Sequence, residues 1–92
     1  MKATIKPDFI VNNIAGEQIL IGGGEQINFS KMLILNETSA HLIALLQKRT
    51  AATDEELARC LTEVYDVTNE EALADVKELL QQLESLGVVT LE

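Results

Sequence analysis

Cysteine, histidine and aromatic residues are scarce in this chain of 92 residues. It has one cysteine, Cys60, one histidine, His41, no tryptophan, and only 3% aromatic residues. A single cysteine cannot form an internal disulfide, and the apolar residues around Cys60 predict a packed thiol rather than a nucleophile. One histidine and one cysteine also fall short of the ligand set of a zinc site. We therefore expect no metal site and no cofactor.

Long hydrophobic runs are also missing. The longest apolar stretches, Ile19–Ile21 and Met32–Leu35, are far shorter than the roughly 20 residues that cross a bilayer. The first residues lack the apolar block of a secretory signal, so we expect a cytoplasmic protein without a membrane segment. With 47% apolar and 24% charged residues, the composition is that of an ordinary globular protein. A chain of this length has room for one hydrophobic core, which predicts a single domain over residues 1–92.

Basic residues are few, and their distribution is uneven. The chain has 15 acidic residues against 7 basic ones, for a formal net charge of −8. Residues 1–53 hold four acids and five bases, whereas residues 54–92 hold eleven acids and only Arg59 and Lys77 as bases. Nucleic-acid binding requires several Lys or Arg contacts to phosphates. The charge therefore argues against a nucleic-acid partner.

The first half of the chain has the pattern of a small antiparallel sheet. Short apolar and β-branched stretches are separated by turn residues, which is typical of half-buried strands. Gly22–Gly24 interrupts any regular element, and Ser30–Lys31 predicts a bend. We expect three or four strands, at Phe9–Ile14, Gln18–Ile21, Ile27–Phe29 and Met32–Leu35, with a turn at Ala15–Glu17.

The second half has the pattern of three helices. Asn36 is a good N-cap for a helix that ends near Lys48, and Thr53 and Thr68 each begin a capping-box pattern. The second helix ends near Tyr65, and the third runs to Leu86, with Gly87 as its stop. Val88–Leu91 adds a short terminal strand. The fold class is therefore α+β and winged-helix-like, with a small N-terminal antiparallel sheet followed by three helices.

Catalytic patterns are absent from the sequence. Ser39, His41 and Glu37 crowd into one helical turn, without a nucleophile elbow or an oxyanion-donating loop. Gly22–Gly24 has neither the lysine and serine of a Walker loop nor the opening helix of a dinucleotide fingerprint. We expect no enzyme activity and no catalytic residue.

The third helix carries a broad apolar stripe. At about 100° per residue, its seven apolar side chains span roughly 140°. Two interpretations stay open: a central core helix packed by the other helices and the sheet, or a helix whose edge at Leu73 and Leu80 extends towards a groove, beside Lys77 and Glu84. The winged-helix order also allows a DNA-binding regulator, although this helix has five acidic residues and a single lysine. A third alternative is a structural module whose exposed sheet edge pairs with a second copy, giving a homodimer.

One stretch of the sequence resembles a known family. Met32–Ile43, with its apolar strand leading into Leu-Asn-Glu-Thr and an amphipathic helix, resembles the strand-to-helix signature of the pyrroloquinoline quinone biosynthesis protein D family. Ile14–Leu20 resembles the early hairpin of that family, and Glu55–Val67 and Ala72–Leu83 resemble its second and third helices. The stretch Gly22–Lys31 is longer than in the shortest family members, and the frequent glycine after the first helix is replaced around Arg49–Thr50.

The resemblance implies a precursor-peptide recognition element without catalytic activity. Such a domain captures the leader segment of a ribosomally made peptide and presents it to a modifying enzyme, often of the radical S-adenosylmethionine type. The leader adds as a strand to the sheet edge, beside the third helix, which is β-augmentation. Carried onto this chain, the resemblance assigns the edge strand to Met32, Leu33 and Ile34. It assigns the opposite wall of the peptide site to apolar and charged residues of the third helix. Leu73, Val76 and Leu80 form the apolar part, and Lys77 and Glu84 meet leader charges.

Overall fold

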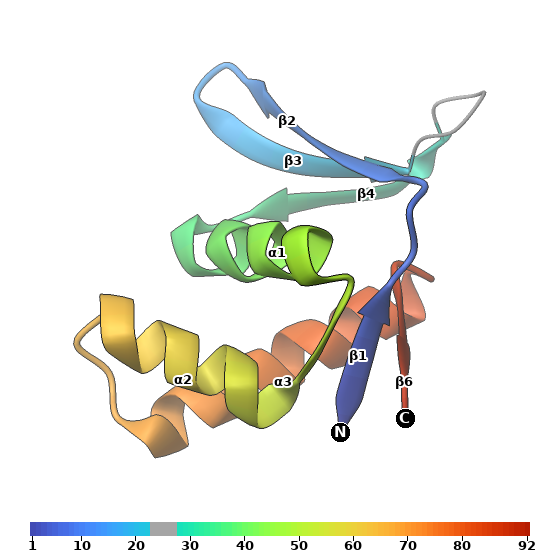
Figure 1. Ribbon diagram of the computed structural model, residues 1–92. Helices are drawn as coiled ribbons and strands as arrows, with labels where there is room; N and C mark the ends of the chain where they lie inside the picture. Colours follow the sequence, from blue (N-terminus) through green and yellow to red (C-terminus); the bar gives the residue numbers. More distant parts are fainter. Residues whose placement is uncertain (23–27) are drawn as a thin grey trace.

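The computed structural model describes residues 1–22 and 28–92 and contains two small sheets and three helices (Figure 1). Within these residues the elements follow the order β1 (Lys2–Ile5), β2 (Phe9–Ile14), β3 (Glu17–Gly22), β4 (Asn28–Leu35), α1 (Glu37–Arg49), β5 (Ala51–Thr53), α2 (Asp54–Val64), α3 (Asn69–Ser85) and β6 (Val89–Leu91). The α+β class predicted from the sequence is confirmed. Most of the predicted connection at Gly22–Gly24 lies outside the described residues, which include only Gly22 of it. Ile27, the start of the next predicted strand, also lies outside them.

The first sheet has the order β2-β3-β4, and both of its pairings are antiparallel. A two-residue turn joins β2 to β3, and both turn residues have a positive φ, 54° at Ala15 and 85° at Gly16. Positive φ at both positions matches the right-handed twist of the strands in a tight hairpin. The predicted turn is therefore confirmed, and it fixes the register in which Ile14 faces Glu17.

The third strand of this sheet differs from the prediction. Two strands separated by a bend at Ser30–Lys31 were expected, but β4 is one strand from Asn28 to Leu35. Its pairing with β3 is irregular instead, because Ile21 faces Met32 whereas the next residue, Gly22, faces Asn28. A bulge of this kind takes up the additional residues of one strand without ending the pairing.

The second sheet, of order β5-β1-β6, was only partly predicted. Its central strand β1 pairs antiparallel with both neighbours, so that Ala3 faces Ala52 on one side and Leu91 on the other. The terminal strand expected at Val88–Leu91 is confirmed as β6, while β1 and β5 were not assigned from the sequence. Both are very short strands whose partners are distant in sequence, and a local pattern cannot reveal such pairing.

The helices begin at the predicted caps. The Asn36 side chain accepts a hydrogen bond from the Ser39 N–H at 2.8 Å, and the Thr53 hydroxyl accepts one from the Glu56 N–H at 3.1 Å. The Glu56 carboxylate in turn accepts from the Thr53 N–H at 3.0 Å, which completes a capping box. That backbone hydrogen bond, followed by hydrogen bonds from Arg49 and the Thr53 hydroxyl, lowers the pKa of Glu56 below its usual value.

Helix α3 begins and ends as expected. The Thr68 hydroxyl accepts from the Glu71 N–H at 3.1 Å, which is the forward half of the predicted capping box. At the other end Gly87 has a φ of 78°, and its N–H donates to the Glu84 carbonyl at 3.0 Å. The Val88 N–H donates to the Leu83 carbonyl at 2.9 Å, which completes a Schellman motif. This reversal directs the chain from α3 straight into β6.

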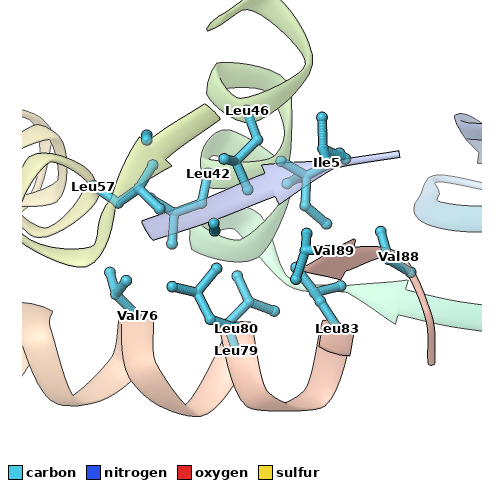
Figure 2. Packing of buried hydrophobic residues seen from close by; sticks show 14 of the residues in the cluster. Ile5, Leu42, Leu46, Leu57, Val76, Leu79, Leu80, Leu83, Val88 and Val89 are labelled. Atoms are coloured by element: carbon cyan, nitrogen blue, oxygen red, sulfur yellow. The ribbon is translucent and has the colours of Figure 1, made fainter. Parts of the chain in front are cut away.

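Helix α1 lies between the β2-β3-β4 sheet and the pair formed by α2 and α3 (Figure 1). Most of the core is between the helices and the second sheet, where Leu46, Val76 and Leu83 are fully buried. Figure 2 shows these side chains converging with Ile5 of β1 and Val89 of β6. The β2-β3-β4 sheet contributes less to this core, chiefly through Phe9, Leu20 and Leu35.

Candidate functional site

The edge of β4 is open. In the described part of the chain β4 pairs with β3 on one side and with no strand on the other. Met32 and Ile34 are 44% and 59% exposed, whereas Leu33 between them is half-buried and packs against the core. This alternation matches a strand with one face on the core and one on solvent. The prediction that Met32, Leu33 and Ile34 lie on an edge strand is confirmed, and their peptide-binding role stays a prediction.

Strand β4 leads directly into the N-terminus of α1. Leu35 is the last strand residue, and Asn36 caps the helix. The Asn36 Oδ1 atom accepts two hydrogen bonds, from the Ser39 N–H at 2.8 Å and from the Thr38 hydroxyl at 2.9 Å. These bonds hold the first turn of α1 in place beside the open edge.

A cavity of about 230 Å³ lies where β4 ends, between the first turn of α1 and the middle of α3. Two polar walls face each other across an apolar base. The wall from α1 is Asn36, Thr38 and Ser39; the base is Leu42, Leu61 and Leu79; the wall from α3 is Asp75, Glu78 and Gln82.

One flank of α3 lines this cavity. Asp75, Glu78, Leu79 and Gln82 recur at spacings of three and four residues, so they share one side of the helix. The buried face lies next to that side. This side of α3 therefore faces the cavity that begins just beyond Leu35, the last residue of β4.

The α3 residues predicted from the sequence lie elsewhere. Val76 and Leu80 are 0% and 1% exposed and belong to the core, so their predicted role as the apolar wall of the peptide site stays a prediction. Leu73 is half-buried and lines a different cavity, with Glu55, Arg59 and Asn69. The stripe is broad because α3 packs against its neighbours over its whole width, so its edge at Leu73 and Leu80 is occupied by the protein itself.

Lys77 and Glu84 are exposed but do not line the cavity at the end of β4. At about 100° per residue, Lys77 is about 200° and Glu84 about 180° from Asp75 around the helix. They therefore lie on the opposite flank of α3. The residues of α3 that line the cavity include the polar series Asp75, Glu78 and Gln82, whose spacing of three and four residues is visible in the sequence.

The two carboxylates at the cavity have no cationic partner among the described residues. The described residues form two ion pairs, Arg49 with Glu56 and the Met1 amino group with Asp54. Neither pair involves Asp75 or Glu78. Asp75 and Glu78 are exposed. This side of α3 therefore presents uncompensated negative charge to whatever lies beside the end of β4.

The outer face of the β2-β3-β4 sheet is apolar. Ile21 of β3 lies between Ile10 of β2 and Met32 of β4, and Ile34 of β4 faces Ile19 of β3. Ile10 is 44% exposed, comparable to Met32. Between these exposed side chains, Ile21 and Ile19 of the middle strand are only 3% and 8% exposed, and Asn12 of β2 faces Ile19. This arrangement depends on the register of three strands, which a local sequence pattern does not contain.

Two further features of the described residues bear on function. Within residues 1–22 and 28–92, no three His, Cys, Asp or Glu side chains gather where they could hold a metal ion. None of the helices in this part of the chain is both long and apolar enough to cross a membrane.

Residues 13–89 match the family model described as coenzyme PQQ synthesis protein D, PqqD. Among curated proteins, no relative matches the chain. Two solved structures have a similar fold, and both are complexes. A lasso peptide synthetase B1 complexed with the leader peptide is 21% identical, with a TM-score of 0.73 over 97% of this chain and 98% of that one. TbiB1 in complex with the TbiA(beta) leader peptide is 17% identical, with a TM-score of 0.71 over 94% and 93% of the two chains.

Proposed function

Since the chain belongs to the PqqD family, we propose that residues 1–92 form one peptide-recognition domain that captures the leader segment of a ribosomally made precursor peptide. The observation that carries the proposal is the open edge of β4 beside a cavity lined by α3. The two structures of similar fold are both leader-peptide complexes, which supports the same function. The domain is a non-catalytic adaptor, and a separate enzyme modifies the peptide.

The leader binds by adding a strand to β4. Backbone N–H and C=O groups at an open edge can pair with an extended peptide of almost any sequence, and side-chain pockets then select among peptides. Met32, Leu33 and Ile34 offer that backbone edge, and Asn36, which follows the last strand residue Leu35, lines the cavity. Because Leu33 faces inward and its neighbours face outward, alternate residues of the leader lie against the core side and the outer side of the sheet.

The enzyme partner is of the radical S-adenosylmethionine class or another peptide-modifying class, and the complex works in the cytoplasm, where ribosomal peptides are made. A protein that only presents the peptide leaves its mass unchanged. Incubating the peptide with this protein alone, and then with the enzyme added, separates the two roles by mass spectrometry. A mass change with this protein alone would contradict the adaptor role.

The binding experiment uses a synthetic leader from the short peptide encoded beside the gene for this protein. Amide shifts in an NMR titration should concentrate at residues 32–35 and along Asp75, Glu78 and Gln82. Two peptides methylated on alternate backbone nitrogens provide a matched pair, because only every second N–H of an added strand faces β4. One of the two should lose binding and the other should keep it. Equal binding by both, or shifts elsewhere, would refute strand addition at β4.

The alternatives make different predictions. A dimer formed by pairing two β4 edges would occupy the same backbone groups, so sedimentation should show a dimer that the leader dissociates. A DNA-binding regulator would require a cationic helix, whereas α3 presents Glu70, Glu71, Asp75 and Glu78 against Lys77. Neither the family match nor the two similar structures supports DNA binding.

A further inference from the structure

We propose that the cavity at the end of β4 binds one lysine or arginine side chain of the captured peptide. This inference rests on the proposed function, because it places a peptide strand on β4, and it adds the chemical identity of one peptide residue. The evidence is the size of the cavity, its two-part lining, its excess of hydrogen-bond acceptors and its position relative to β4.

The volume of the cavity suits a single side chain better than a typical small-molecule ligand. It measures about 230 Å³, whereas pockets for small molecules and cofactors are typically about 300–1,000 Å³. Its lining includes Asn36, the residue that follows β4. A side chain that reaches in from a peptide on β4 can fill it, because the peptide backbone remains outside.

The lining matches an amphipathic side chain. Leu42 and Leu61 are 2% exposed and Leu79 is 7% exposed, so the base is apolar and exposes only a small area. Polar residues of α1 and α3 surround it. The aliphatic stem of a lysine or arginine packs on such a base while the charged group stays at the rim. A purely apolar side chain would leave the two carboxylates of α3 without a partner.

The rim is rich in acceptors. The Asp75 and Glu78 carboxylates accept hydrogen bonds and cannot donate them. On the α1 side, the Thr38 hydroxyl and the Ser39 N–H donate to Asn36 Oδ1. The neutral hydroxyl and amide groups of the lining can donate as well as accept, so the two carboxylates set its charge. A guest that supplies several donors and a positive charge is complementary to this rim. Among peptide side chains, an ammonium or a guanidinium group meets both conditions.

The position predicts where in the peptide the basic residue lies. Asn36 lines the cavity and directly follows Leu35, the last residue of β4. A peptide residue paired with Leu35 is therefore still on the strand, and the cavity opens just beyond it. We expect the lysine or arginine at the end of the strand-forming segment, within about two residues of the one opposite Leu35, since each strand residue advances about 3.3 Å.

The test begins with a displayed library of random dodecapeptides selected against the full protein. The selected peptides should share one position enriched in lysine or arginine, at one end of an apolar β-forming stretch. The same selection against an Asp75→Asn/Glu78→Gln double variant should lose that enrichment and keep the β-forming stretch. An E84Q variant is the control, because it removes a carboxylate from the opposite flank of α3, about 180° from Asp75 around the helix. It should select the same basic position as the unmodified protein.

A selected peptide then allows a direct measurement. Replacing its lysine by norleucine keeps the aliphatic stem and removes the charge, and we expect about tenfold weaker binding, the combined effect of two partly exposed ion pairs. The norleucine peptide should bind the unmodified protein and the double variant equally, because the interaction is already absent. Equal binding of the lysine and norleucine peptides would overturn the proposal, as would enrichment of a basic residue that persists in the double variant.

These outcomes are distinct from a failure of the proposed function. If library peptides bind and respond to backbone methylation but show no basic position, strand addition stands and the cation subsite is wrong. If the library yields no peptide that is sensitive to backbone methylation, both proposals fail together.

Discussion

Leu80 distinguishes the two flanks of α3, and its replacement by alanine tests which flank is buried. The side chain is 1% exposed and lies in the core with Leu79 and Leu83 (Figure 2). A fully buried leucine cut to alanine costs about 3 kcal/mol, within a range of about 2–5 kcal/mol, because transfer energy is lost and a cavity remains. We therefore expect L80A to lower the free energy of unfolding by about that amount.

That cost corresponds to a large shift of the melting temperature. With an unfolding entropy of about 2.1 cal/mol/K per residue, a chain of 92 residues loses roughly 15 °C for about 3 kcal/mol. Circular dichroism during heating, together with urea titration, measures both quantities. The matched control is Ile34→Thr, which alters a side chain that is 59% exposed and keeps a β-branched residue in the strand. It should change stability by no more than about 0.5 kcal/mol.

The outcome separates two arrangements of α3. If Leu80 formed the exposed wall of a peptide groove, L80A would melt within a few degrees of the unmodified protein and would bind peptide poorly. A loss of less than about 1 kcal/mol would refute the burial of Leu80.

Three further predictions concern local features of the fold. Thr53→Ala should lower the free energy of unfolding by about 1 kcal/mol in urea titrations, because it removes the hydroxyl that caps α2, whereas Thr53→Ser should restore most of it. The pKa of Glu56 is lowered in the folded protein, so Glu56 stabilises the fold above its unfolded-state pKa, and this stabilisation is lost as pH falls through the folded-state pKa. E56Q should therefore flatten the fall in melting temperature between neutral and acidic pH. An unchanged slope would contradict this. Gly87→Ala should cost about 1 kcal/mol, because a φ of 78° strains any residue with a Cβ; Ser85→Ala, two residues earlier, is the comparison that should not show this cost.

The helical half was largely predictable from the sequence because its signals are local. Asn36, Thr53 and Thr68 are each followed by the residues whose backbone N–H groups they cap, and Gly87 ends α3 where the apolar repeat ends. The β2-β3 turn was predictable for the same reason. Capping and turn formation involve residues within four positions of one another, so a window of sequence contains the whole interaction.

The site was less predictable because it depends on tertiary packing. A helical wheel orders the side chains of α3 around its axis but does not say which neighbour each flank meets. The broad stripe from Leu73 to Leu86 was extended to the exposed side at Leu80, whereas packing buries Leu80 and leaves Asp75 and Gln82 at the cavity. The open edge of β4 was found correctly, since the run Met32–Leu35 leading into Asn36 marks both a strand and its end.

The pairing of β1 with β6 brings the two ends of the chain together. The Lys2 N–H donates to the Glu92 carbonyl at 3.0 Å, and the Glu92 N–H donates to the Lys2 carbonyl at 2.9 Å. Both ends lie on the side of the molecule away from the β2-β3 hairpin (Figure 1). A short linker can therefore close the chain into a ring, and a permuted gene can start at the exposed Ala15–Gly16 turn without changing any side chain of the cavity. In such a permutant, an enzyme fused to the new terminus at the Ala15–Gly16 turn would lie next to the β2-β3-β4 sheet. Fused to either end of the original chain, it would lie on the side away from the β2-β3 hairpin.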